Sequence, residues 1–254
     1  MQSLARCSSL LLVCLLGVAA CAPQDRGGPF DTASQEEASA INARLGASYL
    51  QSGELQQAHD KLNRALEQDP DNADAHAAYG ILQARLDDPE TAEEHFERAL
   101  RLDPDNPQIK NNFATMLCEQ GDYDRAIDLF LEAADDRLYE TPAFALANAG
   151  TCARDAGRPD EAREHFLGAL DEDPGFHRPR LELAELAYEA ERPDQATEHL
   201  ERYHERARQS ARSLWLGVQI ERMRGDRDAA EDYGRSLVRH FPDSDEAEAF
   251  LESR

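Results

Sequence analysis

The sequence predicts an all-α superhelical solenoid of about six helix-turn-helix units, because one short pattern recurs along the chain. In each copy an alanine, a large apolar residue and a second alanine are spaced i, i+4 and i+7, which is one face of a helix. A proline follows five residues after the second alanine, where a helix cannot continue. The copies consist of Ala58, Leu62, Ala65 and Pro70, of Ala92, Phe96, Ala99 and Pro104, and of Ala162, Phe166, Ala169 and Pro174.

The spacing of these prolines sets the length of the unit. Pro70 and Pro104 are 34 residues apart, and Pro174 follows after two such periods plus two residues. A 34-residue period with two short helices per unit resembles the tetratricopeptide repeat, TPR, so we expect a TPR solenoid. Its six repeats are expected at 39–72, 73–106, 107–140, 143–176, 177–210 and 211–244.

Residue types also predict where the helices begin and how they pack. Asn72 and Asn106 follow the prolines and offer side-chain caps for the next helices. Glycines allow the two helices of a pair to cross closely. They stand at the same position of the first helix in repeats one, two and four, and one position earlier in repeat six. These glycines are Gly46, Gly80, Gly150 and Gly217. Residues 245–254 are expected to form a short capping helix whose Phe250 and Leu251 cover the last repeat.

The N-terminus predicts export and lipid attachment. Arg6 precedes an apolar run that is too short to span a bilayer but suits a lipoprotein signal peptide over residues 1–20. The run ends in "LGVAAC", which resembles the bacterial lipobox, so Cys21 is the expected lipidation site. The alternative is an ordinary signal peptide cut after "VAA". The residue after the cysteine is Ala22 and not the aspartate that resembles an inner-membrane retention signal, so the periplasmic face of the outer membrane is the expected location. Residues 21–38 are expected to form a flexible lipidated tether.

An exported setting leaves two cysteines that can pair. Cys7 and Cys14 lie in the signal peptide and Cys21 takes the lipid, so Cys118 and Cys152 remain. They fall on neighbouring first helices of repeats three and four, and the periplasm is oxidising, so we expect a disulfide. The alternative is two buried cysteines that serve as small apolar residues. No metal site is expected at this pair, because no second Cys or His stands at ligand spacing.

Charge and missing motifs argue against several classes of function. The formal net charge of −24 becomes −25 without residues 1–20, and a surface of this sign repels nucleic acid and anionic lipid. The sequence contains no H-E-x-x-H, no phosphate-binding glycine loop and no G-x-S-x-G. Three histidines follow glutamates at one repeat position, which favours a solvated helix face over an acid-base pair; they are His95, His165 and His199. We therefore expect no enzyme activity, no cofactor and no small-molecule substrate.

The concave face of the stack is the expected protein-binding surface. In TPR stacks it is formed by positions 2, 5, 9 and 12 of each first helix. All four of these residues are apolar in repeat one, as are those at positions 5, 9 and 12 in repeat two. Such a groove fits an amphipathic helix or an extended apolar segment. The alternative is that the small residues only allow tight packing, or that the tether folds back over them. The groove residues are Ala40, Ala43, Ala47, Leu50, Ala77, Ile81 and Ala84.

Repeats three and four place polar side chains on or beside the same face. Their amides and hydroxyls either hydrogen-bond the backbone of a bound peptide or bridge neighbouring helices of the stack. These residues are Asn111, Asn112, Thr115, Asn148 and Thr151.

Two longer stretches carry a narrower resemblance. They read "NNFATMLCEQGDYDRAIDLFLEA" from residue 111 and "YETPAFALANAGTCARDAGRPDEAREHFLGALDEDPGF" from residue 139. They include an asparagine pair before Cys118 and a two-residue insert between repeats at 139–142. Together with the lipobox and "LWLGVQIERMRGD" in repeat six, they resemble the type IV pilus biogenesis and stability lipoproteins, the PilW/PilF pilotin family.

The resemblance implies a non-enzymatic outer-membrane lipoprotein that acts on the periplasmic side. Such a protein would promote localisation and multimerisation of the pilus secretin subunit through TPR protein-protein binding. The alternative is a TPR scaffold of the outer-membrane protein insertion machinery. The insert together with the cysteine pair favours the pilus function.

Overall fold

The computed structural model describes residues 29–253 of the 254-residue chain. In this range all regular secondary structure is helical. The expected signal peptide and Cys21 lie outside the described residues. The helices are α1 Pro29–Gln51, α2 Leu55–Gln68, α3 Ala73–Arg85, α4 Pro89–Leu102, α5 Pro107–Glu119, α6 Tyr123–Ala134, α7 Pro142–Asp155, α8 Pro159–Glu172, α9 Arg178–Glu189, α10 Pro193–His204, α11 Ala211–Arg224, α12 Arg227–His240 and α13 Asp245–Glu252.

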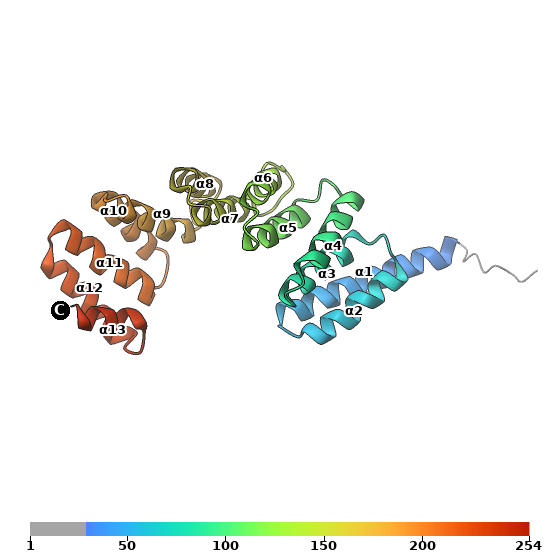
Figure 1. Cartoon of the computed structure of the whole chain (residues 1–254), viewed down its shortest axis with the longest axis horizontal. Helices are drawn as coiled ribbons and strands as arrows, with labels where there is room; N and C mark the ends of the chain where they lie inside the picture. The colour runs from blue at the N-terminus through green and yellow to red at the C-terminus, as the bar shows by residue number, and fades with distance from the viewer. Residues whose placement is uncertain (1–28, 254) are drawn as a thin grey trace, which may run out of the picture.

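The helices pack as antiparallel pairs that stack into an arch (Figure 1). Most first helices of successive pairs contact one another, whereas the second helices make no comparable contact with each other in the part of the chain described. Closer packing on one side curves the stack, so that α5, α7 and α9 lie inside the arch and α6, α8 and α10 outside (Figure 1). The predicted all-α TPR solenoid is confirmed. Helices α1 and α7 begin at Pro29 and Pro142, before the repeat ranges expected to start at residues 39 and 143.

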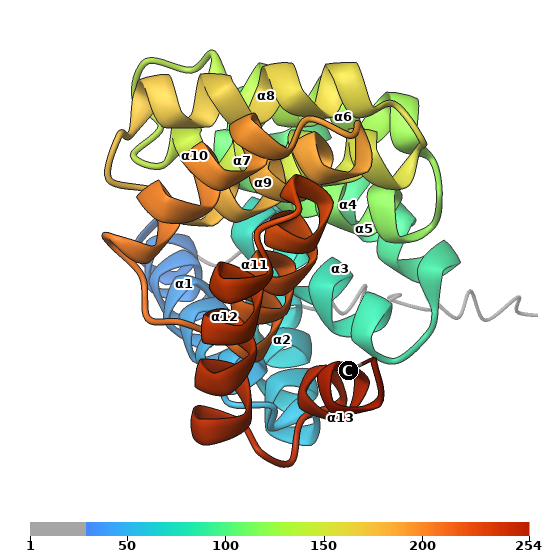
Figure 2. The ribbon, with the colours of Figure 1, turned by 90° about the vertical axis from the view of Figure 1, so that its left-hand side faces the viewer.

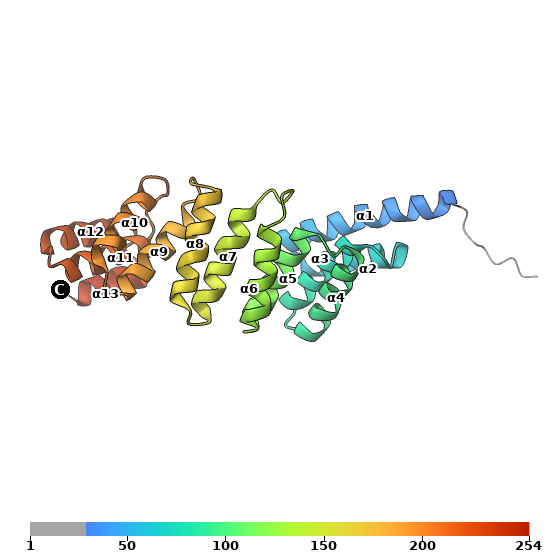
Figure 3. The same ribbon diagram turned by 90° about the horizontal axis from the view of Figure 1, so that it is seen from above.

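Helix α1 is longer than the sequence predicted. It spans 23 residues against 14 in α2, and its N-terminal part projects beyond α2 (Figure 3). The expectation of a flexible tether over 21–38 is therefore wrong for residues 29–38, which are helical. Proline suits a first helical position, as at Pro29, and the residues that follow include the helix formers Glu36 and Glu37.

Close contacts between a glycine and a large side chain join the two helices in four of the pairs, those of repeats one, two, four and six. A Cβ atom added to Gly80 would lie 2.8 Å from the Phe96 ring, and one added to Gly217 would lie 2.7 Å from the Tyr233 ring. The same contact joins Gly46 to Leu62 and Gly150 to Phe166. In repeat six, Gly217 and Tyr233 each stand one position earlier in the repeat than their counterparts do. Because both are displaced equally, they still contact each other.

Both predicted asparagine caps are confirmed. The side-chain oxygen of Asn72 accepts a hydrogen bond from the backbone N–H of Ala75 at 2.9 Å. That of Asn106 accepts from the N–H groups of Gln108 and Ile109 at 3.1 and 3.2 Å. These bonds satisfy N–H groups that have no partner within the helix and fix where α3 and α5 begin.

Helix α13 covers the C-terminal end of the stack (Figure 2). Phe250 is buried, with its ring against Gly234 of α12, as a capping residue requires. Leu251 is 51% exposed, so the expectation that it also covers the last repeat is wrong. The two residues are adjacent in an eight-residue helix and therefore point about 100° apart around its axis.

Candidate protein-binding surface

A pocket of about 340 Å³ opens between α3 and α5, the first helices of repeats two and three. Phe96 reaches its lining from α4, the partner of α3. The lining combines apolar side chains with amide, hydroxyl and charged groups. The apolar residues are Ile81, Ala84, Phe96 and Met116, and the polar ones are Arg85, Asn112, Thr115 and Glu119.

The pocket includes only part of the predicted groove. Ile81 and Ala84 line it, and Ala40 and Ala47 are half-buried nearer the N-terminus. The other three predicted residues offer almost no surface to a partner, because α3 packs against α1 and the neighbouring helices cover them. They are Ala43, Leu50 and Ala77, at 3%, 3% and 6% exposure. The groove is therefore shorter than expected, and the binding role of the accessible residues stays a prediction.

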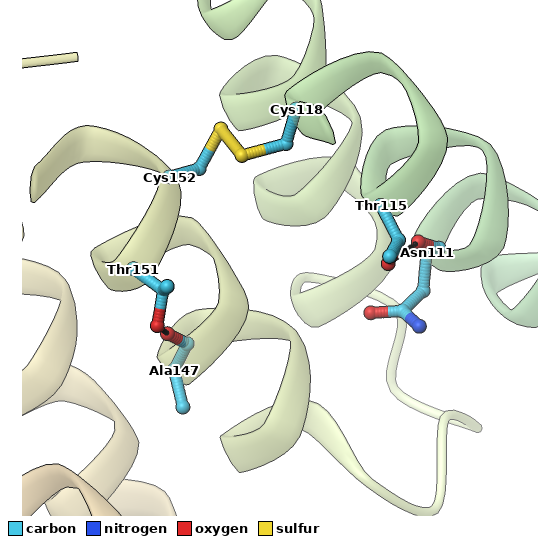
Figure 4. The surroundings of a disulfide bond; sticks show 6 residues. All are labelled: Asn111, Thr115, Cys118, Ala147, Thr151 and Cys152. Atoms are coloured by element: carbon cyan, nitrogen blue, oxygen red, sulfur yellow. Dashed lines mark hydrogen bonds between the residues drawn. A yellow bond between two sulfur atoms is a disulfide. The ribbon is translucent and has the colours of Figure 1, made fainter. Parts of the chain in front are cut away.

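The predicted polar contacts divide between the pocket and the helix packing. Asn112 and Thr115 line the pocket. Asn148 of α7 donates a hydrogen bond to the side-chain oxygen of Asn111 on α5 at 3.3 Å, so this pair bridges neighbouring helices. The Thr151 hydroxyl donates to the carbonyl of Ala147, and that of Thr115 donates to the carbonyl of Asn111 (Figure 4). Asn111 and Asn148 therefore bridge neighbouring helices of the stack, which is the structural alternative to contacting a bound peptide.

The two remaining cysteines also join α5 to α7 (Figure 4). Cys118 and Cys152 are disulfide-bonded in the structure, with their Cα atoms 5.8 Å apart. The bond and the Asn148–Asn111 hydrogen bond lie on the same two helices. Helix α5 also carries one wall of the pocket, so both links restrain a wall of the candidate site.

Beyond the pocket, the first helices of repeats four to six carry a charged cluster. Arg154 of α7 and Arg212 of α11 both bind Glu182 and Glu185 of α9. The Glu182 side chain is only 7% exposed, and Arg154 is 27% exposed. Hydrogen bonding to Glu185 raises the pKa of Arg212 above its usual value, so Arg212 stays positively charged. It ties three successive repeats together on the inner side of the arch.

The sequence reasoning missed the cluster and half of the pocket. Arg154, Glu185 and Arg212 occupy positions 12, 9 and 2 of their repeats, so the concave-face pattern would have found them had it been applied to the later repeats. Phe96 was recognised as a core residue, and the pattern gave no reason to expect its ring in a pocket. Among residues 29–253, no helix is long and apolar enough to cross a membrane.

Comparison with known families identifies the repeats. Tetratricopeptide repeat models match residues 44–107, 106–171 and 153–215. The type IV pilus assembly protein PilF of Pseudomonas aeruginosa is 32% identical over 244 residues, which cover 96% of this chain and 97% of that protein.

Solved structures agree with the sequence comparison. A Pseudomonas aeruginosa PilF structure has a TM-score of 0.76 and 33% identity, covering 87% of this chain and all of that chain. The crystal structure of PilW, described as a widely conserved type IV pilus biogenesis factor, has the same TM-score and 29% identity, covering 84% of this chain and 98% of that one. Both similarities extend over nearly the whole of the solved chains.

Proposed function

Because the chain belongs to the family of type IV pilus biogenesis TPR proteins, we propose that it is an outer-membrane lipoprotein that helps pilus secretin subunits to reach the outer membrane and to multimerise. The TPR stack supports a function in protein-protein binding within the cell envelope. The lipobox-like sequence before Cys21 supports the lipid anchor, and Ala22 supports the outer-membrane address.

The observation that carries the binding proposal is the pocket between α3 and α5. Ile81 and Ala84 provide the accessible apolar lining above the buried side chains of Phe96 and Met116, and a volume of about 340 Å³ suits one large apolar side chain of a partner. Asn112 and Thr115 lie in the same lining and can hydrogen-bond the partner's backbone beside that side chain. We propose that an exposed apolar segment of the secretin subunit binds here while the lipid directs the complex to the outer membrane.

Substituting Ala84→Glu tests this proposal. The longer side chain would fill the pocket and place a polar carboxylate where an apolar group is meant to bind. We expect a normal protein level with loss of secretin multimers from membrane extracts and loss of surface pili. Thr115→Trp fills the same pocket from an exposed position without a charge and is expected to act alike.

Ala229→Glu is the matched control. Ala229 is half-buried in the first turn of α12, far along the chain from the pocket, where a glutamate is favourable. This variant should keep multimers and pili. Intact multimers in both folded pocket variants would contradict the proposed binding site. A general loss of outer-membrane proteins with intact pili in a deletion strain would instead support the insertion-scaffold alternative.

A further inference from the structure

Two histidines from different helices meet in repeat two. His76 lies on α3 and His95 on α4, and their Nδ1 atoms are 3.0 Å apart. The Nε2 atom of His76 lies 3.0 Å from the carbonyl oxygen of Pro70, so Nε2 carries the proton and donates to that oxygen. The Nδ1 atom of His76 therefore accepts a hydrogen bond from the Nδ1–H of His95, and a cation bound by both Nδ1 atoms would replace that proton, leaving His95 protonated on Nε2. Tyr79 stacks on the His95 ring at 4.4 Å between centroids and restrains its orientation.

This arrangement has the features of a pair of metal ligands. Zn²⁺ lies about 2.0 to 2.1 Å from an imidazole nitrogen, so two such nitrogens on one ion are separated by about 2.9 to 3.4 Å at bond angles of about 90 to 110°. The Nδ1 separation falls in this range. Metal-binding histidines also commonly donate their other N–H to a backbone carbonyl, as His76 does to Pro70.

The surroundings leave room for the remaining ligands of a cation. A pocket of about 410 Å³ lies beside the pair and is also lined by Glu94 and Glu97. Two arginines share this lining, and each is bound to an acidic residue: Arg98 to Asp71 and Arg101 to Glu97. No group of three His, Cys, Asp or Glu side chains within residues 29–253 is arranged around one ion. The site would therefore have two protein ligands, with water completing the coordination.

We propose that His76 and His95 bind a first-row transition-metal cation, Zn²⁺ or Cu²⁺, through their Nδ1 atoms. Neutral imidazole suits both metals, whereas Mg²⁺ and Ca²⁺ prefer oxygen ligands. The ion joins α3 to α4, and Phe96, the residue after His95, lines the concave pocket. Metal binding thus stabilises the helix pair that forms one side of that pocket, independently of which partner the pocket accepts.

Calorimetric titration of the purified protein with Zn²⁺ tests this site, using protein without a histidine tag. We expect one ion per chain and at least tenfold weaker binding in His76→Gln and in His95→Gln. His165→Gln is the matched control, because His165 has the same repeat position as His95 and its Nε2 has no hydrogen-bond partner. This control should bind Zn²⁺ like the wild type. The absence of binding by the wild type, or equal binding by all variants, would overturn the proposal.

A measurement on the unaltered protein covers the case in which the glutamine variants do not fold. In nitrogen-15 spectra of the imidazole rings, Zn²⁺ should shift the Nδ1 signals of His76 and His95 and leave that of His240 unchanged. Unshifted Nδ1 signals at saturating Zn²⁺ would overturn the site. A rise in melting temperature with Zn²⁺ in the wild type, absent from both variants, is the expected consequence for stability.

Discussion

The ring of Phe96 occupies the space that a side chain at Gly80 would need. A Cβ atom at Gly80 would lie 2.8 Å from the ring atom Cδ2, closer than packed carbon atoms approach. Phe96 is fully buried, so its ring cannot move aside into solvent. The close crossing of α3 and α4 thus depends on the missing side chain.

Substituting Gly80→Ala should destabilise the protein by about 1 to 2 kcal/mol, because overpacking outweighs the gain in helix propensity. Gly168→Ala is the control within another helix, since its Cβ would meet only Leu146 at an ordinary 3.6 Å. This control should be neutral or stabilise by up to about 1 kcal/mol. Urea unfolding measures both changes, and a stabilised Gly80→Ala variant would refute the packing account.

The disulfide prediction concerns Cys118 and Cys152, which are separated by 34 residues. A crosslink across a loop of this length should stabilise the protein by about 3 to 4 kcal/mol in the chain-entropy model. Reductant should therefore lower the melting temperature of the wild type and leave that of the Cys118→Ala/Cys152→Ala double variant unchanged. Thiol counting after denaturation without reductant decides the redox state: two reactive thiols from this pair would mean that no bond forms.

Much of the fold could be predicted because repeat positions translate directly into contacts. Gly80 and Phe96 hold fixed positions in the 34-residue unit, so their contact followed from the period, as did the proximity of Cys118 and Cys152. The start of α1 was missed because the glycines and prolines near residue 28 suggested a loop, although the residues after Pro29 include the helix formers Glu36 and Glu37.

The candidate site was less predictable, because the sequence does not distinguish a small residue that lines a groove from one that packs against the next helix. Ala77 and Ala84 are both concave-face alanines, and only Ala84 reaches the pocket. The contact between His76 and His95 could not be predicted either. His76 has no counterpart in the other repeats, and the pair depends on how two side chains turn across a helix crossing.

The charged cluster around Glu182 should contribute more to stability than an exposed ion pair. Glu182→Ala removes a nearly buried carboxylate that binds Arg154 and Arg212, leaving both guanidinium groups with fewer partners, and should cost about 1 to 2 kcal/mol. Glu198→Ala removes an exposed pair with Arg202 within one helix and should cost less than about 0.5 kcal/mol. Equal midpoints in urea unfolding for the two variants would show that the cluster adds no stability.

The proposed lipid anchor predicts a change of location without a change of fold. Cys21→Ser removes the acceptor thiol, so the variant should leave the outer-membrane fraction while its circular dichroism stays helical. Cys14→Ser, within the expected signal peptide, is the matched control and should remain with the outer membrane. Retention of the Cys21→Ser variant in outer membranes, in a strain that lacks the secretin, would argue against lipid attachment.

Protonation of His95 should weaken the fold in mild acid. Burial, followed by the nearby charge of His76, lowers the pKa of His95 from 6.5 to about 4. The unfolded chain therefore binds a proton on this ring between these two values while the folded chain does not, and stability must fall as the pH decreases through this window. Above pH 6.5 the stabilising contribution is fully present, and at pH 4 most of it is lost.

This loss can be separated from the protonation of carboxylates by comparing variants. We expect the wild type to lose about 1 to 2 kcal/mol more than His95→Gln between pH 7 and pH 4.5, because glutamine does not titrate. His240→Gln alters an exposed histidine and should follow the wild type. Urea unfolding at a series of pH values, with a chelator present so that no metal contributes, measures the difference. Parallel curves for the wild type and His95→Gln would mean that His95 accepts its proton as readily in the folded as in the unfolded chain.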